Sequence, residues 1–335
     1  MPWMTEKTMS GPIERPDLPE DVDLFQTFGP GFDRFDFPGP VCRVTGGHGG
    51  EALLICGSEK TALLDCGMAY CGPTTADNAK KVLAGMGRDL DMIFLSHSHY
   101  DHIGALPWLK KAFPGAQVLA SRHCAGILSR PNARKLMGAL GQEAKDLYAP
   151  DSPVEIITEG LAVDRIIEDG ETVSLGEEKV TALATPGHTD CSMSYCLQPA
   201  GILFTSESTG ILEGKDYVHT PCLKSFVQAV NVSMPKCRAA NPRYLCLPHF
   251  GMVPGDYTDR YWEMFREECK SKTRFVDGMC REGLDREAML DAYIERYWTP
   301  AKAMEQPKEA FRLNSGYILD TLLREREELL AWADA

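Results

Sequence analysis

A short apolar run that ends in a cluster of histidines constrains this chain more than any other feature. Residues 91–102 read DMIFLSHSHYDH, so an unbroken apolar segment is followed at once by three imidazoles and a carboxylate. An apolar run without alternation is typical of a strand in a sheet that is covered on both faces. The chain must therefore fold around a buried strand whose end carries His97, His99, Asp101 and His102.

Short apolar segments alternate with turns and helical patterns along residues 41–255. The segments VCRVT, EALLIC and TALLDCG are separated by glycine-containing turns and predict successive antiparallel strands. Further along, helical spacing in LPWLKKAF, SRHCAGILS and PNARKLMGALGQEAKDLY alternates with strand-like segments such as AQVLAS, KVTALA and GILFTS. The pattern predicts an α/β fold.

Three regions of the chain differ in character. Residues 1–37 are polar and rich in proline, which predicts an N-terminal arm. Residues 38–255 hold the alternating strands and helices and form the predicted catalytic domain. Residues 256–335 show only amphipathic helical patterns, such as LDREAMLDAYIERYW, and predict a helical C-terminal region.

Charge and hydrophobicity narrow the choice of partners. The formal net charge is −13, which argues against nucleic acid as the main partner because phosphate binding relies on basic patches. No apolar run approaches the ~20 residues that cross a bilayer, and the N-terminus lacks the pattern of a signal peptide. We therefore expect no membrane partner and a cytoplasmic location. The twelve cysteines contain no C-x-x-C pair and are expected to be buried free thiols.

The residues after the buried strand predict a metal site. His97 and His99 alternate in an extended segment and can point to the same side, whereas Asp101 and His102 follow a bend. One cation can bind the first pair and a second cation can bind the other pair. Imidazole and carboxylate ligands favour zinc, iron or manganese over magnesium or calcium. Two ligands do not complete a tetrahedral site, so more are expected after later strands; the candidates are His188 in TPGHTD, Glu207 in FTSES and His249 in LPHFG.

The order of these motifs resembles the metallo-β-lactamase superfamily. H-x-H-x-D-H follows a buried strand, and then come a P-G-H-T loop, a strand that ends in an acid, and a P-H-x-G loop. The segment TALLDCG is similar to the family's early strand that ends in Asp-x-Gly. The resemblance covers about residues 38–255 and implies an αββα sandwich with a C-terminal helical extension. It implies two divalent metal ions, one held by His97, His99 and His188 and the other by Asp101, His102 and His249.

Glu207 departs from the family pattern. The family usually has an aspartate that bridges the two metals, normally within a Gly-Asp pair, and here Ser206-Glu207 stands in its place. Glutamate is longer by one methylene. Either Glu207 bridges two metals in a slightly altered site, or it binds one metal or none and leaves a weakened or single-metal site.

The resemblance implies a dinuclear metal-dependent hydrolase. A hydroxide bridging the metals would attack the substrate, and Asp101 would orient the water and accept its proton. The helical C-terminal region resembles glyoxalase II and the aminobenzoylacetyl-CoA thioesterase of quinolone signalling, in which helices cover the active site. A small-molecule thioester or another activated acyl compound is therefore the first choice of substrate.

Other functions stay open at this point. Lactone or phosphodiester hydrolysis is the alternative within the same class. A non-catalytic regulatory or ligand-binding member of the fold is a second class. A diiron redox protein is less favoured, because the motif of those proteins carries a glutamate where this chain has His99.

Several further residues are candidates for support or substrate contact. Tyr217 and His219 lie in a polar segment soon after Glu207, and Phe250 flanks the last ligand loop. Asp65 is expected to support the ligand loops rather than to act on substrate. His48, in GGHGG, is interpreted as a turn residue, with substrate contact as the alternative. A homodimer through the C-terminal helices also stays open.

Overall fold

The protein is described by a computed structural model that covers residues 39–213, 217–249, 252–254, 257–299 and 308–334. The predicted N-terminal arm and Phe250 lie outside these residues. The described part of the chain contains two six-stranded sheets, a two-stranded ribbon and helices.

The first sheet mixes antiparallel and parallel pairing. Its first three strands pair antiparallel, as the sequence predicts, and the next three add in parallel. In spatial order the strands are β1 (Val41–Arg43), β2 (Leu53–Cys56), β3 (Thr61–Leu64), β4 (Met92–Phe94), β5 (Gln117–Ala120) and β6 (Arg165–Ile166).

The second sheet is built from the later half of the described chain. Its strands pair antiparallel except for β10 and β13, which are parallel. In spatial order they are β14 (Met252–Pro254), β13 (Tyr244–Cys246), β10 (Ile202–Phe204), β9 (Met193–Gln198), β8 (Lys179–Ala184) and β7 (Thr172–Ser174). The ribbon consists of β11 (Ile211–Glu213) and β12 (Tyr217–His219).

The apolar strands of the first sheet are buried on both faces. In β4, Met92 and Phe94 join a core shared with residues of the second sheet, whereas Ile93 joins a separate core on the other face. Successive side chains of a strand point to opposite faces, so an unbroken apolar run serves both cores. The expectation of a doubly covered sheet is confirmed.

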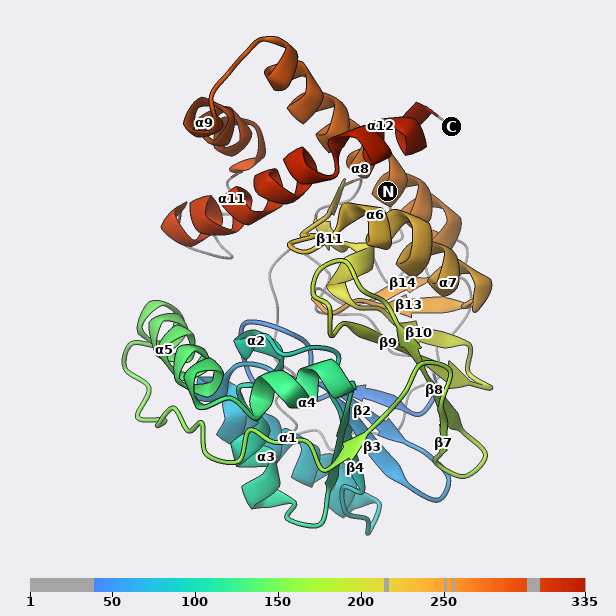
Figure 1. Cartoon of the computed structure of the whole chain (residues 1–335). Helices are drawn as coiled ribbons and strands as arrows, with labels where there is room; N and C mark the ends of the chain where they lie inside the picture. The colour runs from blue at the N-terminus through green and yellow to red at the C-terminus, as the bar shows by residue number, and fades with distance from the viewer. Residues whose placement is uncertain (1–38, 214–216, 250–251, 255–256, 300–307, 335) are drawn as a thin grey trace.

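Helices form the outer layers of this sandwich (Figure 1). The outer core of the first sheet includes residues of α1 (Gly72–Gly85), α3 (Leu106–Ala112) and α4 (Arg122–Leu128), and also Ile103. The Ser121 side chain accepts a hydrogen bond from the Cys124 amide and caps α4, as the sequence predicts. The other helices before residue 257 are η3 (Ala69–Cys71), α2 (Tyr100–Ile103), α5 (Pro131–Tyr148), η4 (Glu207–Thr209), α6 (Phe226–Gln228), the π-helical turn η5 (Ala229–Ser233) and α7 (Met234–Ala239).

The described residues after 256 contain helices and no strand, which agrees with the sequence pattern. They are α8 (Thr258–Arg281), α9 (Arg286–Tyr297), α11 (Lys308–Arg324) and α12 (Arg326–Asp334). This helical region is stacked on one end of the sandwich (Figure 1). The α8 helix packs against β12 and β14, and its Tyr261 hydroxyl donates to the carbonyls of Thr209 and Gly210.

The cysteines form no disulfides. All twelve are free and eleven of them are buried, as predicted. Within the described ranges, no helix is both long and apolar enough to cross a bilayer.

Candidate metal centre

The predicted ligands meet because the strands that precede them end at one edge of the sandwich. His97 follows β4 of the first sheet, while His188, Glu207 and His249 follow β8, β10 and β13 of the second. The strands β8, β10 and β13 run in the same direction, since β9 is antiparallel to β8 and β10 and β13 is parallel to β10. Loops from both sheets therefore bring their side chains to the same place.

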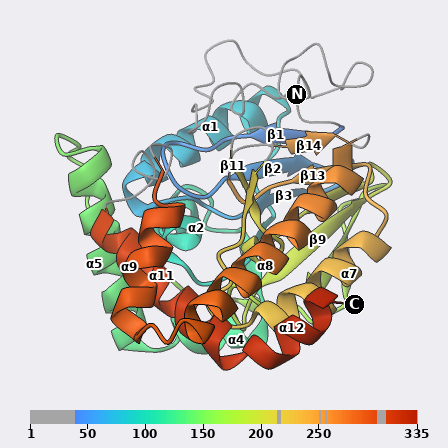
Figure 2. The same ribbon diagram turned by 90° about the horizontal axis from the view of Figure 1, so that it is seen from above.

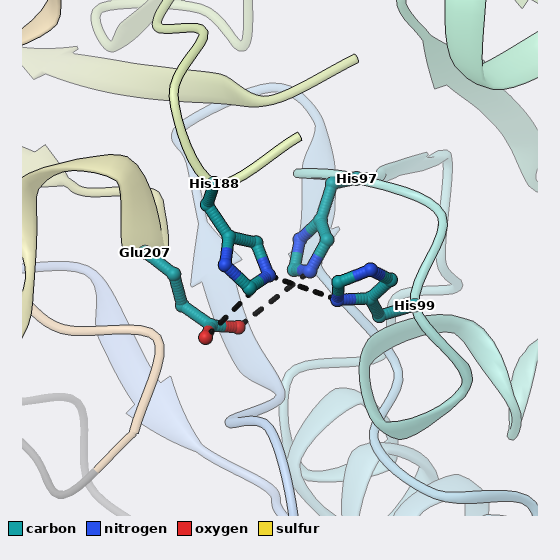
Figure 3. A group of neighbouring side chains, drawn as sticks. All are labelled: His97, His99, His188 and Glu207. Carbon is teal, nitrogen blue, oxygen red and sulfur yellow. Dashed lines mark hydrogen bonds and ion pairs between the residues drawn. The ribbon is translucent and has the colours of Figure 1, made fainter. Parts of the chain in front are cut away.

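The first group of ligand atoms comes from His97, His99, His188 and Glu207, which all point to one spot (Figure 3). Their ligand atoms lie within 4.8 Å of one another. Nε2 of His188 is 2.9 Å from Nδ1 of His99. Glu207 places Oε1 3.5 Å from Nε2 of His97 and Oε2 3.6 Å from Nε2 of His188.

The second group consists of Asp101, His102, Glu207 and His249. A short helix, α2, begins after His99, and its turn directs Asp101 and His102 to a position beside the first group. Nε2 of His102 lies 2.9 Å from Oε1 of Glu207 and 3.4 Å from Oδ2 of Asp101. Nε2 of His249 lies 3.6 Å from each of the same two oxygens.

Glu207 belongs to both groups. Its Oε1 faces His97, His102 and His249, and its Oε2 faces His188. The residue begins the short helix η4 directly after β10 and is buried. The longer glutamate side chain thus reaches the space between the two groups.

Asp65 supports one histidine in each group. Its Oδ2 accepts from Nδ1 of His102 at 3.1 Å and from the Ser96 hydroxyl at 2.5 Å, while Oδ1 accepts from the Ser96 amide at 2.7 Å. The Ser96 hydroxyl lies 2.9 Å from Nδ1 of His97 and can accept a hydrogen bond from it. Both imidazoles then keep Nδ1–H and present Nε2 to the centre. The supporting role that the sequence predicts for Asp65 matches this geometry.

Backbone carbonyls orient two more histidines. Nδ1 of His188 donates to the carbonyl of Pro221 at 2.5 Å, and Nδ1 of His249 donates to the carbonyl of Gly49 at 3.1 Å. The glycine loop after β1 is a close fit, because a Cβ on Gly50 would lie 2.5 Å from Nδ1 of His102. Sequence reasoning missed Ser96, Pro221 and this role of the glycines, since each depends on a contact between distant segments.

The electrostatics suit metal ligands in the first group. Burial, and then the neighbouring imidazoles, lower the pKa of His97, and burial and His188 lower the pKa of His99 to about 4. Burial opposes ionisation of Glu207, but the charge of His188 and a hydrogen bond from His102 hold its pKa well below the ordinary value. Neutral imidazoles and a carboxylate are the forms that bind divalent metals.

The second group favours the protonated form of His102 as long as no metal is bound. Burial lowers the pKa of His102, but the nearby Asp101, with further hydrogen bonds to Asp65 and Glu207, raises it well above its ordinary value. A metal ion would take the place of this proton between imidazole and carboxylates.

The residues fit a metal. Nε2 of His97 is buried and makes no hydrogen bond to the described part of the chain, yet it points at the first group. A buried nitrogen without a hydrogen bond is costly, and a cation bound between it and the Glu207 carboxylate would satisfy it. Nitrogen and carboxylate donors in this mixture suit zinc, iron or manganese.

The predicted substrate residues lie elsewhere than in the two ligand groups. The Tyr217 hydroxyl donates to Glu268 of α8 at 3.0 Å. His219 is buried, and burial followed by the charge of Lys272 lowers its pKa well below the ordinary value. Phe250 lies outside the described residues.

The fold and the site together define a class of protein. Two facing mixed sheets, helices on the outside, and His/Asp/Glu groups at the strand ends are the αββα arrangement that the sequence predicts. Residues 45–215 match the profile of the metallo-beta-lactamase superfamily, and the chain belongs to that superfamily.

Comparison with individual proteins agrees with this membership. A probable metallo-hydrolase of Burkholderia pseudomallei (strain 1710b) is 29% identical over 44% of this chain and 47% of its own length. A hydroxyacylglutathione hydrolase of Gloeobacter violaceus is 29% identical over 42% of this chain and 43% of its own length. The chain thus spans about half the length of the curated relatives it matches.

A solved structure supports the fold over a longer stretch. A metallo-beta-lactamase family protein of Thermus thermophilus matches 86% of this chain and 94% of its own, with a TM-score of 0.56 and 16% identity. At this identity the similarity concerns the fold alone.

Proposed function

We propose that the protein is a dinuclear metal-dependent hydrolase of a thioester or another activated acyl compound. The observation that carries the proposal is the sharing of Glu207 between two groups of imidazole and carboxylate ligands. His97, His99 and His188 would hold one cation, Asp101, His102 and His249 would hold the other, and Glu207 would bridge them. The metals would be zinc, iron or manganese.

The chemistry that these residues would gain from two bound metals is a water that is nucleophilic near neutral pH and a polarised substrate carbonyl. The chain contributes the positioning. The Asp101 side chain is 18% exposed, compared with 0% for His97 and His102. It can therefore reach a water at the open side of the centre, orient it and accept its proton. Asp65 keeps Nδ1 of His102 protonated and so holds Nε2 ready as a ligand.

A thioester is the first choice of substrate for two reasons. The C-terminal helices resemble those that cover the site of glyoxalase II, and several of the matched relatives are named hydroxyacylglutathione hydrolase. The α8 helix packs against β12, and its Tyr261 bonds the carbonyl of Thr209, so the C-terminal helices contact the segment that follows Glu207. We also propose a domain boundary near residue 255. We further propose a cytoplasmic location, because a chain with many buried free thiols suits a reducing compartment.

Metal analysis of the full chain, purified without added metal, tests the centre. Two equivalents of zinc, iron or manganese are expected, and a protein that binds no metal even after incubation with these ions would refute the mechanism. A panel of acyl-CoA thioesters, lactones and bis-nitrophenyl phosphate then separates the substrate classes. Turnover of thioesters is expected, whereas binding of metal without turnover of any of them would favour a non-catalytic member of the fold.

Substitution of Glu207 tests the bridge. Glu207→Asp is expected to retain two equivalents, because a shorter carboxylate can still contact both groups, and Glu207→Ala is expected to lose at least one. Glu177→Ala is the matched control, since that glutamate is exposed on a turn. Retention of both equivalents by Glu207→Ala would contradict the bridging role.

A further inference from the structure

The ligand side chains of the metal centre differ in exposure, and His99, Asp101 and His249 are the ones that are only partly buried. The side chains of His97 and His102 are 0% exposed and that of His188 is 4% exposed, whereas those of His249 and Asp101 are 14% and 18% exposed. A substrate can therefore approach from the side of Asp101 and His249. The residues beside that opening are in a position to select the substrate.

Aromatic rings from three separate segments gather there. Tyr100 directly precedes Asp101 in α2, Tyr148 ends α5, and His48 belongs to the glycine loop after β1. The rings of His48 and Tyr148 are stacked, with centroids 4.9 Å apart and planes 11° from parallel. Tyr100 and Tyr148 both pack against one small apolar cluster that includes Met68 and Tyr70.

The position of α5 explains how the rings come together. The helix α2 packs against α5, and α2 lies between α5 and the strands (Figure 2). The Ala144 side chain of α5 is buried in the same cluster as Met68. The predicted helical insertion thus forms the outer side of the opening next to Asp101.

The side chains of the three aromatic residues are only partly buried, so their rings are accessible to a ligand. His48, Tyr100 and Tyr148 are each half-buried, whereas the aromatic residues between the two sheets, such as Phe94 and Tyr195, are buried. The surface therefore offers flat ring faces and edges to a ligand.

We propose that His48, Tyr100 and Tyr148 form an aromatic wall that binds a planar aromatic acyl group attached to the reacting carbonyl. Tyr100 directly precedes Asp101 in α2, and the Gly49 carbonyl beside His48 accepts from Nδ1 of His249, so the wall lies next to the two more exposed ligands of the second group. A ring placed there can stack on the wall or meet it edge to face. This inference rests on the proposed function and adds the substrate class: aromatic acyl esters or thioesters rather than short aliphatic ones.

Selectivity between two substrates provides the first test. The metal-loaded full-length enzyme is assayed with benzoyl-CoA and acetyl-CoA, and the ratio of the two kcat/KM values is compared among variants. Tyr148→Leu and His48→Ala are each expected to lower the benzoyl-to-acetyl ratio by about 2- to 10-fold, the range for loss of one aromatic contact. Tyr317→Leu is the control, because that tyrosine lies on α11 and is 55% exposed. An unchanged ratio in both wall variants would overturn the proposal.

Binding of 2-naphthoate, a planar aromatic carboxylate, provides a test that does not depend on turnover. Equilibrium dialysis with the metal-loaded protein is expected to show binding that each wall variant weakens by a similar factor. His48→Ala leaves α5 unaltered, so it serves if Tyr148→Leu fails to fold. Naphthoate binding that weakens in the variants, without hydrolysis of any acyl compound, would refute the proposed function and keep the wall. Acyl hydrolysis with no effect of the variants on the kcat/KM ratio or on naphthoate binding would keep the proposed function and refute the aromatic wall.

Discussion

The carboxylate of Asp65 offers a direct test of how the two ligand groups are organised. Asp65 accepts hydrogen bonds from the Ser96 amide, the Ser96 hydroxyl and Nδ1 of His102. Its backbone is left-handed, with φ 53°, a conformation that asparagine tolerates better than alanine does. Asp65→Asn therefore changes the hydrogen bonding with little backbone strain.

The expected loss follows from the number of donors. An amide offers one acceptor oxygen in place of two and adds an NH₂ group, so at least one of the three donors loses its partner. If that donor is Nδ1 of His102, the proton moves to Nε2 and the imidazole no longer presents a lone pair to a metal. Loss of such a supporting residue typically costs 10- to 100-fold in metal affinity, or about 1.4–2.7 kcal/mol. One unpaired buried donor also lowers the free energy of unfolding by about 1–3 kcal/mol.

Calorimetric titration of the metal-free protein with zinc measures both affinities, and urea unfolding measures stability. Asp65→Asn is expected to weaken both metals, because one carboxylate supports His102 directly and His97 through Ser96. Ser96→Ala is expected to weaken the first metal more than the second. Asp146→Asn is the control, since that carboxylate is exposed on α5. Binding of two equivalents by Asp65→Asn with wild-type affinity would show that these hydrogen bonds do not organise the centre.

Two further substitutions test contacts around the site. Gly50→Ala is expected to weaken metal binding in titrations and to lower stability by about 1–3 kcal/mol, because its Cβ would lie 2.5 Å from Nδ1 of His102. Gly126→Ala, where a Cβ meets nothing within 4 Å, should instead be stabilising by about 0.5–1 kcal/mol, and equal behaviour of the two variants would contradict the steric argument. Tyr261→Phe removes the hydroxyl that donates to two backbone carbonyls at 2.8 and 3.0 Å and should cost about 1–2 kcal/mol in urea unfolding. As a control, Tyr317→Phe on the exposed face of α11 should change the free energy of unfolding by less than about 0.5 kcal/mol. If Tyr261→Phe loses no more than this control, the hydrogen bonds of Tyr261 do not hold α8 in place.

Local sequence was enough to predict much of the fold. The unbroken apolar run of β4, the antiparallel order of β1 to β3 and the cap of α4 at Ser121 all follow from periodicity and capping chemistry, which act within a few residues. The polar residues at the ends of four strands were also visible in the sequence. The end of a strand can be recognised from the local sequence. Its polar side chains can therefore be identified as candidate ligands before the positions of the other ligands are known.

The tertiary structure decided how those residues act together. Ser96 and Asp65 are 31 positions apart, and His249 and Gly49 are 200 apart, so only the packing of two sheets shows that one orients or anchors the other. The same holds for the stack of His48 on Tyr148, which brings the glycine loop after β1 and the end of α5 together. The sequence by itself determined which residues can act as metal ligands, because the residue type fixes the donor atoms. Which atoms converge, and which side of the centre stays open, depended on long-range packing, which no local pattern encodes.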